Sequence, residues 1–231
     1  MRRHIVATFI ILFILVLILN DPWAANSPGL AGQGETHVTA TGVSPTDESN
    51  SPEDVLCYVD VNTPLPYLRC GTPAKHFQAL RQDVIDGAGF DFLSKCGDMM
   101  RPKNAKSSKT GVAFRSRHKR GEAFDYNQED HRVLLVREHK AGHVYWRTYL
   151  RCEKQDGTLG VKADLYTDNS GFVSAYVFDF TATAESLGWE RIPAQRGWMY
   201  EPSNKEFWHY QMRGDLSFDQ AMRTIYVDAT Y

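Results

Sequence analysis

The chain has 231 residues with 42% hydrophobic and 12% aromatic content, which is enough for one domain with a packed core and excludes a wholly disordered protein. Its 26 Lys and Arg against 28 Asp and Glu give a formal net charge of −2, so the chain as a whole lacks a basic excess. We therefore expect one folded domain with attached segments.

Residues 1–25 have the composition of a signal peptide or signal anchor. A basic start at residues 1–4 precedes an unbroken apolar run at 5–19, which is shorter than the roughly 20 residues of a membrane span. The small residues at 24–25 suit cleavage, whereas Trp23 favours an uncleaved inner-membrane anchor, and both outcomes stay open. In either case we expect the rest of the chain to be exported to the periplasm or the cell exterior.

A linker separates this signal from the folded domain. Residues 26–54 are rich in Ser, Thr, Gly and Pro, contain acids but no Lys or Arg, and are predicted to be a disordered acidic linker. Residues 55–231 then form the predicted domain.

All four cysteines lie in the exported part of the chain. In an oxidising compartment they can form two disulfides with three connectivities. We favour Cys57 with Cys70 and Cys96 with Cys152. Zinc binding by these thiols is the competing interpretation, but no C-x-x-C spacing supports it.

The predicted elements of the domain combine helices with antiparallel strands. Apolar residues at helical spacing, followed by Gly87, predict a helix over 74–87. Two segments rich in β-branched and aromatic residues predict a hairpin, and two further strands and a short helix follow: 132–137, 144–150, 161–166, 172–180 and 183–187. This order predicts an α+β fold with a small antiparallel sheet flanked by helices.

The segment 95–120 is strongly basic. It contains nine Lys or Arg and one acid, Asp98. Such a segment either attracts anionic substrates or is a solvated loop. No aromatic stacking pattern accompanies the charges, so we expect no nucleic-acid partner.

The most informative stretch is 116–125, with the spacing S-x-H-x-x-G-x-A-x-D. It supplies two metal ligands, His118 and Asp125. Gly121 and Ala123 have little or no side chain, so the chain between the ligands can fold closely around a metal ion.

A second motif, E-x-W-H, lies at 206–209. His209 completes a set of three ligands, the number typical of catalytic zinc, which keeps one position open for water. Glu206 remains as a general base for hydrolysis. The other clustered histidines fit no ligand motif and are predicted to be exposed: His131, His139 and His143.

Together the two motifs resemble the signature of the VanY-type zinc D-alanyl-D-alanine carboxypeptidases. That family also includes phage L-alanyl-D-glutamate endolysins and has the hedgehog/DD-peptidase fold. The resemblance covers most of residues 90–213 and implies that His118, Asp125 and His209 bind Zn²⁺ and that Glu206 is the catalytic base. The sequence differs from the family in its long segment between the two motifs and in lacking an S-G-Y triplet.

The resemblance also implies an arginine that contacts the substrate and stabilises the oxyanion. The Arg-Pro that follows S-G-Y in the family matches Arg101, and Arg115 is the rival because it precedes Ser116 in a similar element at a different distance. We assign Ser116, Arg115 and Trp208 to substrate binding.

The activity implied by the resemblance is cleavage of peptidoglycan stem peptides by a monomeric enzyme, with D-alanyl-D-alanine carboxypeptidase as the first interpretation. An L,D-endopeptidase of the endolysin type is the alternative within the family. A non-catalytic cell-wall or protein-binding module on the same fold is the alternative outside it. Glu206 favours an enzyme, because a binding module has no need of a base.

Overall fold

The computed structural model describes residues 55–106, 115–214 and 216–226. The predicted export signal 1–25 and linker 26–54 lie outside the described residues, so both stay predictions. No helix in the described part of the chain is long and apolar enough to cross a membrane.

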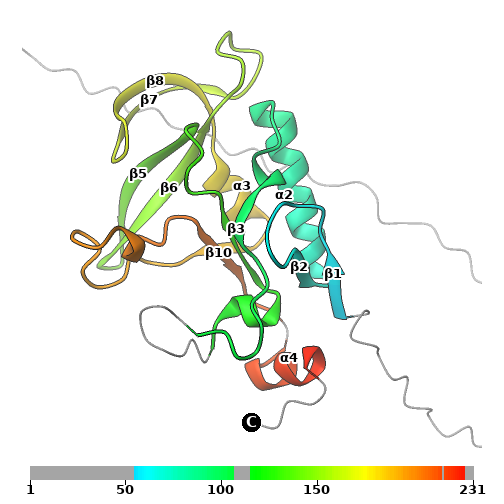
Figure 1. Cartoon of the computed structure of the whole chain (residues 1–231). Helices are drawn as coiled ribbons and strands as arrows, with labels where there is room; N and C mark the ends of the chain where they lie inside the picture. Colours follow the sequence, from blue (N-terminus) through cyan, green and yellow to red (C-terminus); the bar gives the residue numbers. More distant parts are fainter. Residues whose placement is uncertain (1–54, 107–114, 215, 227–231) are drawn as a thin grey trace, which may run out of the picture. The chain divides into compact units, whose positions relative to one another are not determined.

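Two four-stranded antiparallel sheets and a two-stranded hairpin form the β-structure (Figure 1). The central sheet has the order β3-β4-β10-β9, and the second sheet has the order β5-β6-β8-β7. The strands are β1 (Leu56–Tyr58), β2 (Tyr67–Arg69), β3 (Cys96–Asp98), β4 (Ala123–Tyr126), β5 (Val133–Lys140), β6 (His143–Arg151), β7 (Val161–Thr167), β8 (Gly171–Phe178), β9 (Trp189–Arg191) and β10 (His209–Met212). The helices are α2 (Thr72–Ala88), α3 (Phe180–Ser186) and α4 (Phe218–Ile225), with short 3-10 helices η1 (Phe92–Ser94), η2 (Arg117–Arg120) and η3 (Pro202–Asn204). The predicted α+β class is confirmed.

Helix α2 confirms the helix predicted over 74–87. Gly89 ends it in the left-handed conformation, with φ at 87°. The side chains of Phe77 and Leu80 are fully buried on its apolar face. The ring of Phe77 lies 5.1 Å from that of Phe124 in β4, so α2 packs against the central sheet.

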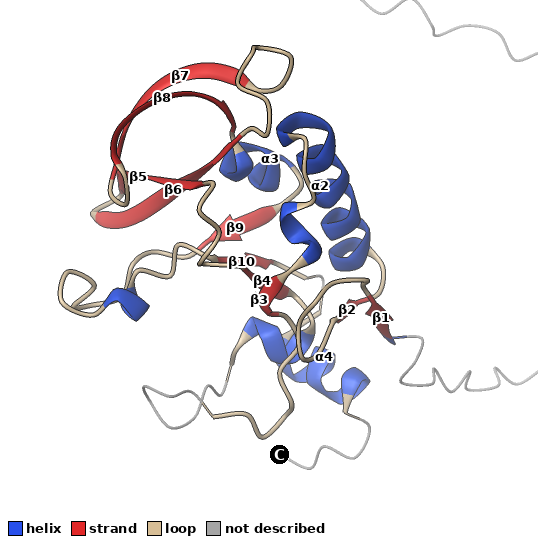
Figure 2. Cartoon of the chain, turned by 45° about the horizontal axis from the view of Figure 1, so that its top comes forward, coloured by secondary structure: helices blue, strands red, loops and turns tan. Residues whose placement is uncertain are grey.

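The two faces of the central sheet have different surroundings. Helices α2 and α3 lie on one side of it and α4 on the other (Figure 2). Phe124 and Tyr210 face the α2 and α3 side, where Phe180 of α3 packs 5.2 Å from the ring of Tyr210. Since neighbouring residues of a strand point to opposite faces, Asp125 and His209 both face the α4 side.

The second sheet contains the predicted hairpin and curls strongly (Figure 2). Strands β5 and β6 pair from Val133 with Leu150 to Lys140 with His143. The turn places Ala141 and Gly142 at φ of 51° and 78°, the conformation of tight hairpin turns.

The predicted end of the strand over 172–180 is wrong. The strand stops at Phe178, because the Asp179 side chain accepts a hydrogen bond from Ala182 N and caps α3. The helix predicted over 183–187 therefore begins earlier, at Phe180.

One of the two predicted disulfides is confirmed. Cys57 and Cys70 form a disulfide that joins the ends of the β1–β2 hairpin. The predicted pairing of Cys96 with Cys152 is wrong, because both cysteines are free and buried. Their thiols donate to backbone carbonyls of two different segments, at 3.7 and 3.6 Å, so each sulfur is packed in its own surroundings.

Helix α4 is not among the elements predicted from the sequence, although the spacing of Ser217 and Gln220 is a signal for a helix start. Its N-terminus has a capping box, in which Ser217 and Gln220 exchange side-chain and backbone hydrogen bonds. The buried residues of α4 are Ala221, Met222 and Ile225. Just after it, the Tyr226 hydroxyl donates to the carbonyl oxygen of Arg101, 2.9 Å away. An eight-residue helix is marginal in isolation, so packing against the domain supplies its stability.

Candidate metal centre

Two of the three predicted ligands lie side by side on neighbouring strands of the central sheet. Strands β4 and β10 are antiparallel, and His209 pairs directly with Asp125. Both are buried, on the face opposite the aromatic core. The distance from Asp125 Oδ1 to His209 Nδ1 is 2.9 Å. Sheet register and pleating thus bring together two ligands that are far apart in the sequence.

The third ligand, His118, lies on η2. Its Nδ1 donates to the carbonyl oxygen of Met99, 2.7 Å away, so its Nε2 is directed at the other two ligands. Gly121 ends η2 with φ at 61°, which turns the chain into β4. A Cβ at Gly121 would lie 2.5 Å from the backbone nitrogen of Arg69, so the motif needs glycine for both conformation and space.

The three inward-facing atoms form a compact triangle. His118 Nε2 lies 3.2 Å from His209 Nδ1 and 3.3 Å from Asp125 Oδ1. Ligands about 2.0 to 2.2 Å from a tetrahedral metal ion are about 3.3 to 3.6 Å apart, so the triangle is close to the size required.

The hydrogen bonds of the two imidazoles also favour a cation. His118 Nδ1 donates to a carbonyl, and His209 Nε2 lies 3.3 Å from Gln211 Oε1. Each ring therefore has a partner for the nitrogen that points away from the centre, and its inward nitrogen, which contacts Asp125, can become a ligand by releasing its proton when a metal ion binds. This arrangement is typical of metal-binding histidines. The buried group can hold a metal ion, as predicted.

Asp125 is ionised in this environment. Burial by itself raises the pKa of its carboxyl group, but the charge and hydrogen bond of His118 and the hydrogen bond of His209 outweigh burial. The net effect lowers the pKa of Asp125 well below its ordinary value of 3.8. A ligand carboxylate has to be deprotonated, and Asp125 meets this requirement at neutral pH.

Of the two candidate arginines, Arg101 lies at the centre. Its Nη2 is 3.6 Å from Asp125 Oδ2, and its Nε donates to Asp98. Its backbone nitrogen also donates to the carbonyl oxygen of His118. The Arg101 side chain remains 34% exposed, so it is accessible from solvent. Arg115 is exposed and makes no hydrogen bond or ion pair with the residues that the structure describes.

Glu206 stands at the start of the turn that leads into β10. Its carbonyl oxygen accepts from His209 N at 3.2 Å, a four-residue turn that keeps the two Cα atoms within about 7 Å. Its φ is 56°, which is uncommon for a residue with a side chain and is enriched at functional sites. The Glu206 carboxylate accepts a hydrogen bond from Gln195 Nε2, 2.6 Å away.

The remaining predicted residues lie close to the ligands in the chain. Ser116 is the half-buried residue that precedes η2, and its carbonyl oxygen accepts from Lys119 N. Trp208 is buried in the core beside Phe207, at 4.6 Å between rings. A role of either residue in substrate binding stays a prediction.

Family models, curated proteins and solved structures give no match. The VanY resemblance therefore rests on the two sequence motifs.

Sequence reasoning missed two residues of the centre. Asp98 holds Arg101 in place, and its signal was its position as the only acid among nine basic residues in 95–120. Gln195 binds Glu206 from a loop eleven residues upstream, and no sequence pattern identifies it.

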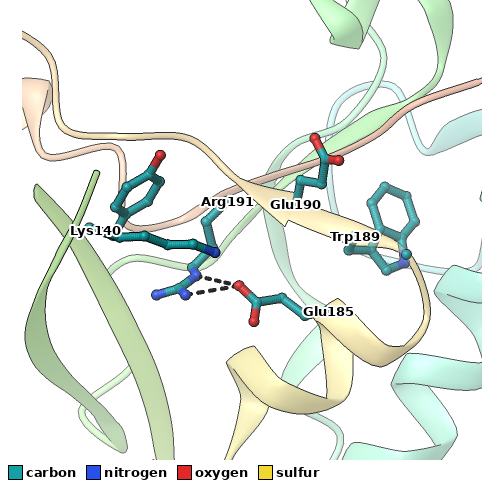
Figure 3. A pocket seen from close by; sticks show the side chains of 7 residues that line it. Lys140, Glu185, Trp189, Glu190 and Arg191 are labelled. Atoms are coloured by element: carbon teal, nitrogen blue, oxygen red, sulfur yellow. Dashed lines mark hydrogen bonds and ion pairs between the residues drawn. The ribbon is translucent and has the colours of Figure 1, made fainter. Parts of the chain in front are cut away.

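A separate pocket of about 390 Å³ opens beside β9 (Figure 3). Arg191 and Glu185 form an ion pair there, with 2.8 Å between Nη2 and Oε1. Its lining includes none of the three ligands, and neither Glu206 nor Arg101. We assign the chemistry to the buried ligand group and give this pocket no role.

Proposed function

We propose that this protein is an exported zinc-dependent peptidase of the VanY type that cleaves peptidoglycan stem peptides, with D-alanyl-D-alanine carboxypeptidase as its activity. One observation carries the proposal. His118 Nε2, Asp125 Oδ1 and His209 Nδ1, from two separate motifs, converge within 3.3 Å of one another.

The donor set supports zinc. Two imidazole nitrogens and one carboxylate are typical ligands of catalytic zinc, with a fourth position left for water or substrate. Bound zinc supplies a Lewis acid that polarises a carbonyl and makes water a nucleophile at neutral pH. The proposal includes the hedgehog/DD-peptidase fold, and what supports it is the coarser α+β architecture, an antiparallel sheet flanked by helices.

In this proposal Glu206 is the general base. Its backbone starts the turn that ends at His209, so the residue lies next to a ligand in the chain, and it is not a member of the ligand group. It takes a proton from the attacking water and passes it to the leaving amine. The hydrogen bond from Gln195 orients the carboxylate for this transfer.

Arg101 is the proposed partner of the substrate. Its guanidinium is held by Asp98 and Asp125 and remains partly exposed. The donors that face solvent can bind a substrate carboxylate or the negative charge that develops on the scissile carbonyl. A stem peptide that ends in a carboxylate suits this arrangement.

The proposed location comes from the sequence. The apolar run 5–19 and the basic residues before it support export to the periplasm or cell exterior, with or without an inner-membrane anchor. We propose that the enzyme acts as a monomer.

Metal analysis and digestion of purified peptidoglycan test the proposal together. The expected results are one zinc per chain and release of D-alanine from pentapeptide stems, identified by mass spectrometry. Cleavage between L-alanine and D-glutamate would instead identify an endolysin-type endopeptidase. Binding to sacculi without cleavage would identify a module, and iron in place of zinc would overturn the proposed chemistry, because two histidines and a carboxylate also hold Fe(II).

A further inference from the structure

Glu122, between η2 and β4, is a fully buried carboxylate surrounded by three arginines. Its Oε2 accepts from Arg117 Nη1 at 2.9 Å and from Arg120 Nη2. Its Oε1 lies 3.1 Å from Arg69 Nη2, which comes from β2. One buried acid thus joins three cations from two parts of the chain.

This group holds the segment that carries His118. Arg117 and Arg120 flank that ligand within the four residues of η2, and both are bound to Glu122. A 3-10 helix of this length has little stability of its own, and η2 has no side-chain cap. Its position therefore depends on contacts with the rest of the domain.

The same group reaches the strand that carries His209. Arg117 Nη1 also donates to the carbonyl oxygen of Met212 at the end of β10, 2.9 Å away. The Met212 backbone nitrogen donates in turn to the carbonyl oxygen of Glu122, 2.8 Å away. Glu122 itself lies three residues before Asp125. The segments of all three ligands are thereby joined around one carboxylate.

A contribution to the stability of the fold is a weak explanation for this buried group of one glutamate and three arginines. Removing charges from water is costly, and buried ion pairs often stabilise a fold no better than apolar side chains of similar size. Their better-supported use is to select one arrangement of the chain. Here that arrangement is the one in which η2 and β10 bring His118 and His209 together.

We propose that Glu122 is a positioning residue of the metal centre. It fixes η2 against β10 through Arg117 and Arg120, and so sets the distance between His118 and His209. The role rests on the metal centre of the proposed function.

The test compares Glu122→Gln with Glu138→Gln. Glu138 in β5 also binds two arginines, Arg147 at 3.4 Å and Arg191 at 2.9 Å, but neither arginine lies on a segment that carries a ligand. Zinc affinity is measured by titration with a competing chelator. The geometry of the centre is followed through the visible absorption of the Co²⁺-loaded protein. Circular dichroism establishes that each variant is folded.

We expect Glu122→Gln to lower zinc affinity about 10- to 100-fold, the usual effect of losing a residue that orients ligands, and to change the Co²⁺ spectrum. Glu138→Gln should leave both unchanged. Equal affinity and an identical spectrum for Glu122→Gln and the parent would overturn the inference. Absence of metal binding by the parent would instead overturn the proposed function, so the two failures are distinguishable.

If Glu122→Gln does not fold, Arg117→Ala decides the matter. The Arg117 side chain is 25% exposed, so its removal is less disruptive to packing. It removes the contacts to Glu122 and to Met212. A weaker zinc affinity in this variant supports the positioning role, and an unchanged affinity overturns it.

Discussion

His209 lies directly opposite Asp125 in the β4–β10 pair, with 2.9 Å between Nδ1 and Oδ1. The next pair in the register, Tyr210 with Phe124, stacks its rings 5.7 Å apart on the other face of the sheet. A slip by one residue would send the ligands into the core and the rings toward the metal centre. The aromatic core therefore fixes the register on which the centre depends.

Metal binding should stabilise the folded chain. Metal at about 100 times its dissociation constant adds about 2.7 kcal/mol to the free energy of unfolding, or on the order of 5 to 10 °C in melting temperature. His118→Ala should abolish this shift, as measured by calorimetry with and without chelator. His139→Ala, which removes an exposed histidine of the hairpin, is the control and should keep the shift.

Glu206→Gln should separate hydrolysis from metal binding. We expect the variant to retain zinc while cleavage of stem peptides falls by about 10² to 10⁴, the usual contribution of general acid–base catalysis. Glu190→Gln, at an exposed glutamate of β9, should cleave like the parent. Unchanged cleavage by Glu206→Gln would show that another group is the base.

The two arginine candidates should differ in their effect on catalysis. Arg101→Ala should lower kcat/KM by roughly 10²-fold or more, comparable with the loss of an oxyanion donor. Arg115→Ala should have little effect, because Arg115 is exposed and Arg101 contacts Asp125. Steady-state kinetics on a pentapeptide stem measure both variants. A large loss in Arg115→Ala with little loss in Arg101→Ala would show that Arg115 is the arginine that contacts the substrate.

Thiol titration should find two free cysteines per chain in the denatured, unreduced protein. In the folded protein Cys96 should react slowly with alkylating reagents at pH 8. Burial, with a smaller effect from the negative charge of Asp125, raises the pKa of its thiol to about 12, so the reactive thiolate is scarce. Burial also raises the pKa of Cys152. A count of zero free thiols would show that Cys96 and Cys152 form a disulfide after all.

Gly121→Ala should lower the stability of the fold. Gly121 and Gly142 both have positive φ, so alanine at either position costs about 1 to 2 kcal/mol of unfolding free energy. Only at Gly121 would the new Cβ also collide with backbone, at Arg69 N, whereas no atom lies within 4 Å of a Cβ at Gly142. Chemical denaturation should therefore show a larger loss for Gly121→Ala, and equal losses would contradict the close packing around η2.

The sequence was sufficient where neighbouring residues decide the structure. Helix α2 has apolar side chains at helical spacing and a glycine stop, and the β5–β6 hairpin has two long β-rich segments around a turn. Strands β3, β4 and β9 have three or four residues each, too few to show a period, and α4 has only eight, with its capping box as the one signal in the sequence. These short elements form because the rest of the domain packs against them.

For the candidate metal centre, too, the sequence identified some features and only the tertiary structure decided others. The sequence by itself identified the candidate ligands, because the spacing of His118, Gly121 and Asp125 and the later His209 is local to two motifs. Only the tertiary structure decided that these ligands converge, that Arg101 and not Arg115 contacts Asp125, and that Cys96 and Cys152 stay apart. The physical reason is that each of these outcomes depends on contacts between segments distant in the chain, set by sheet register and core packing.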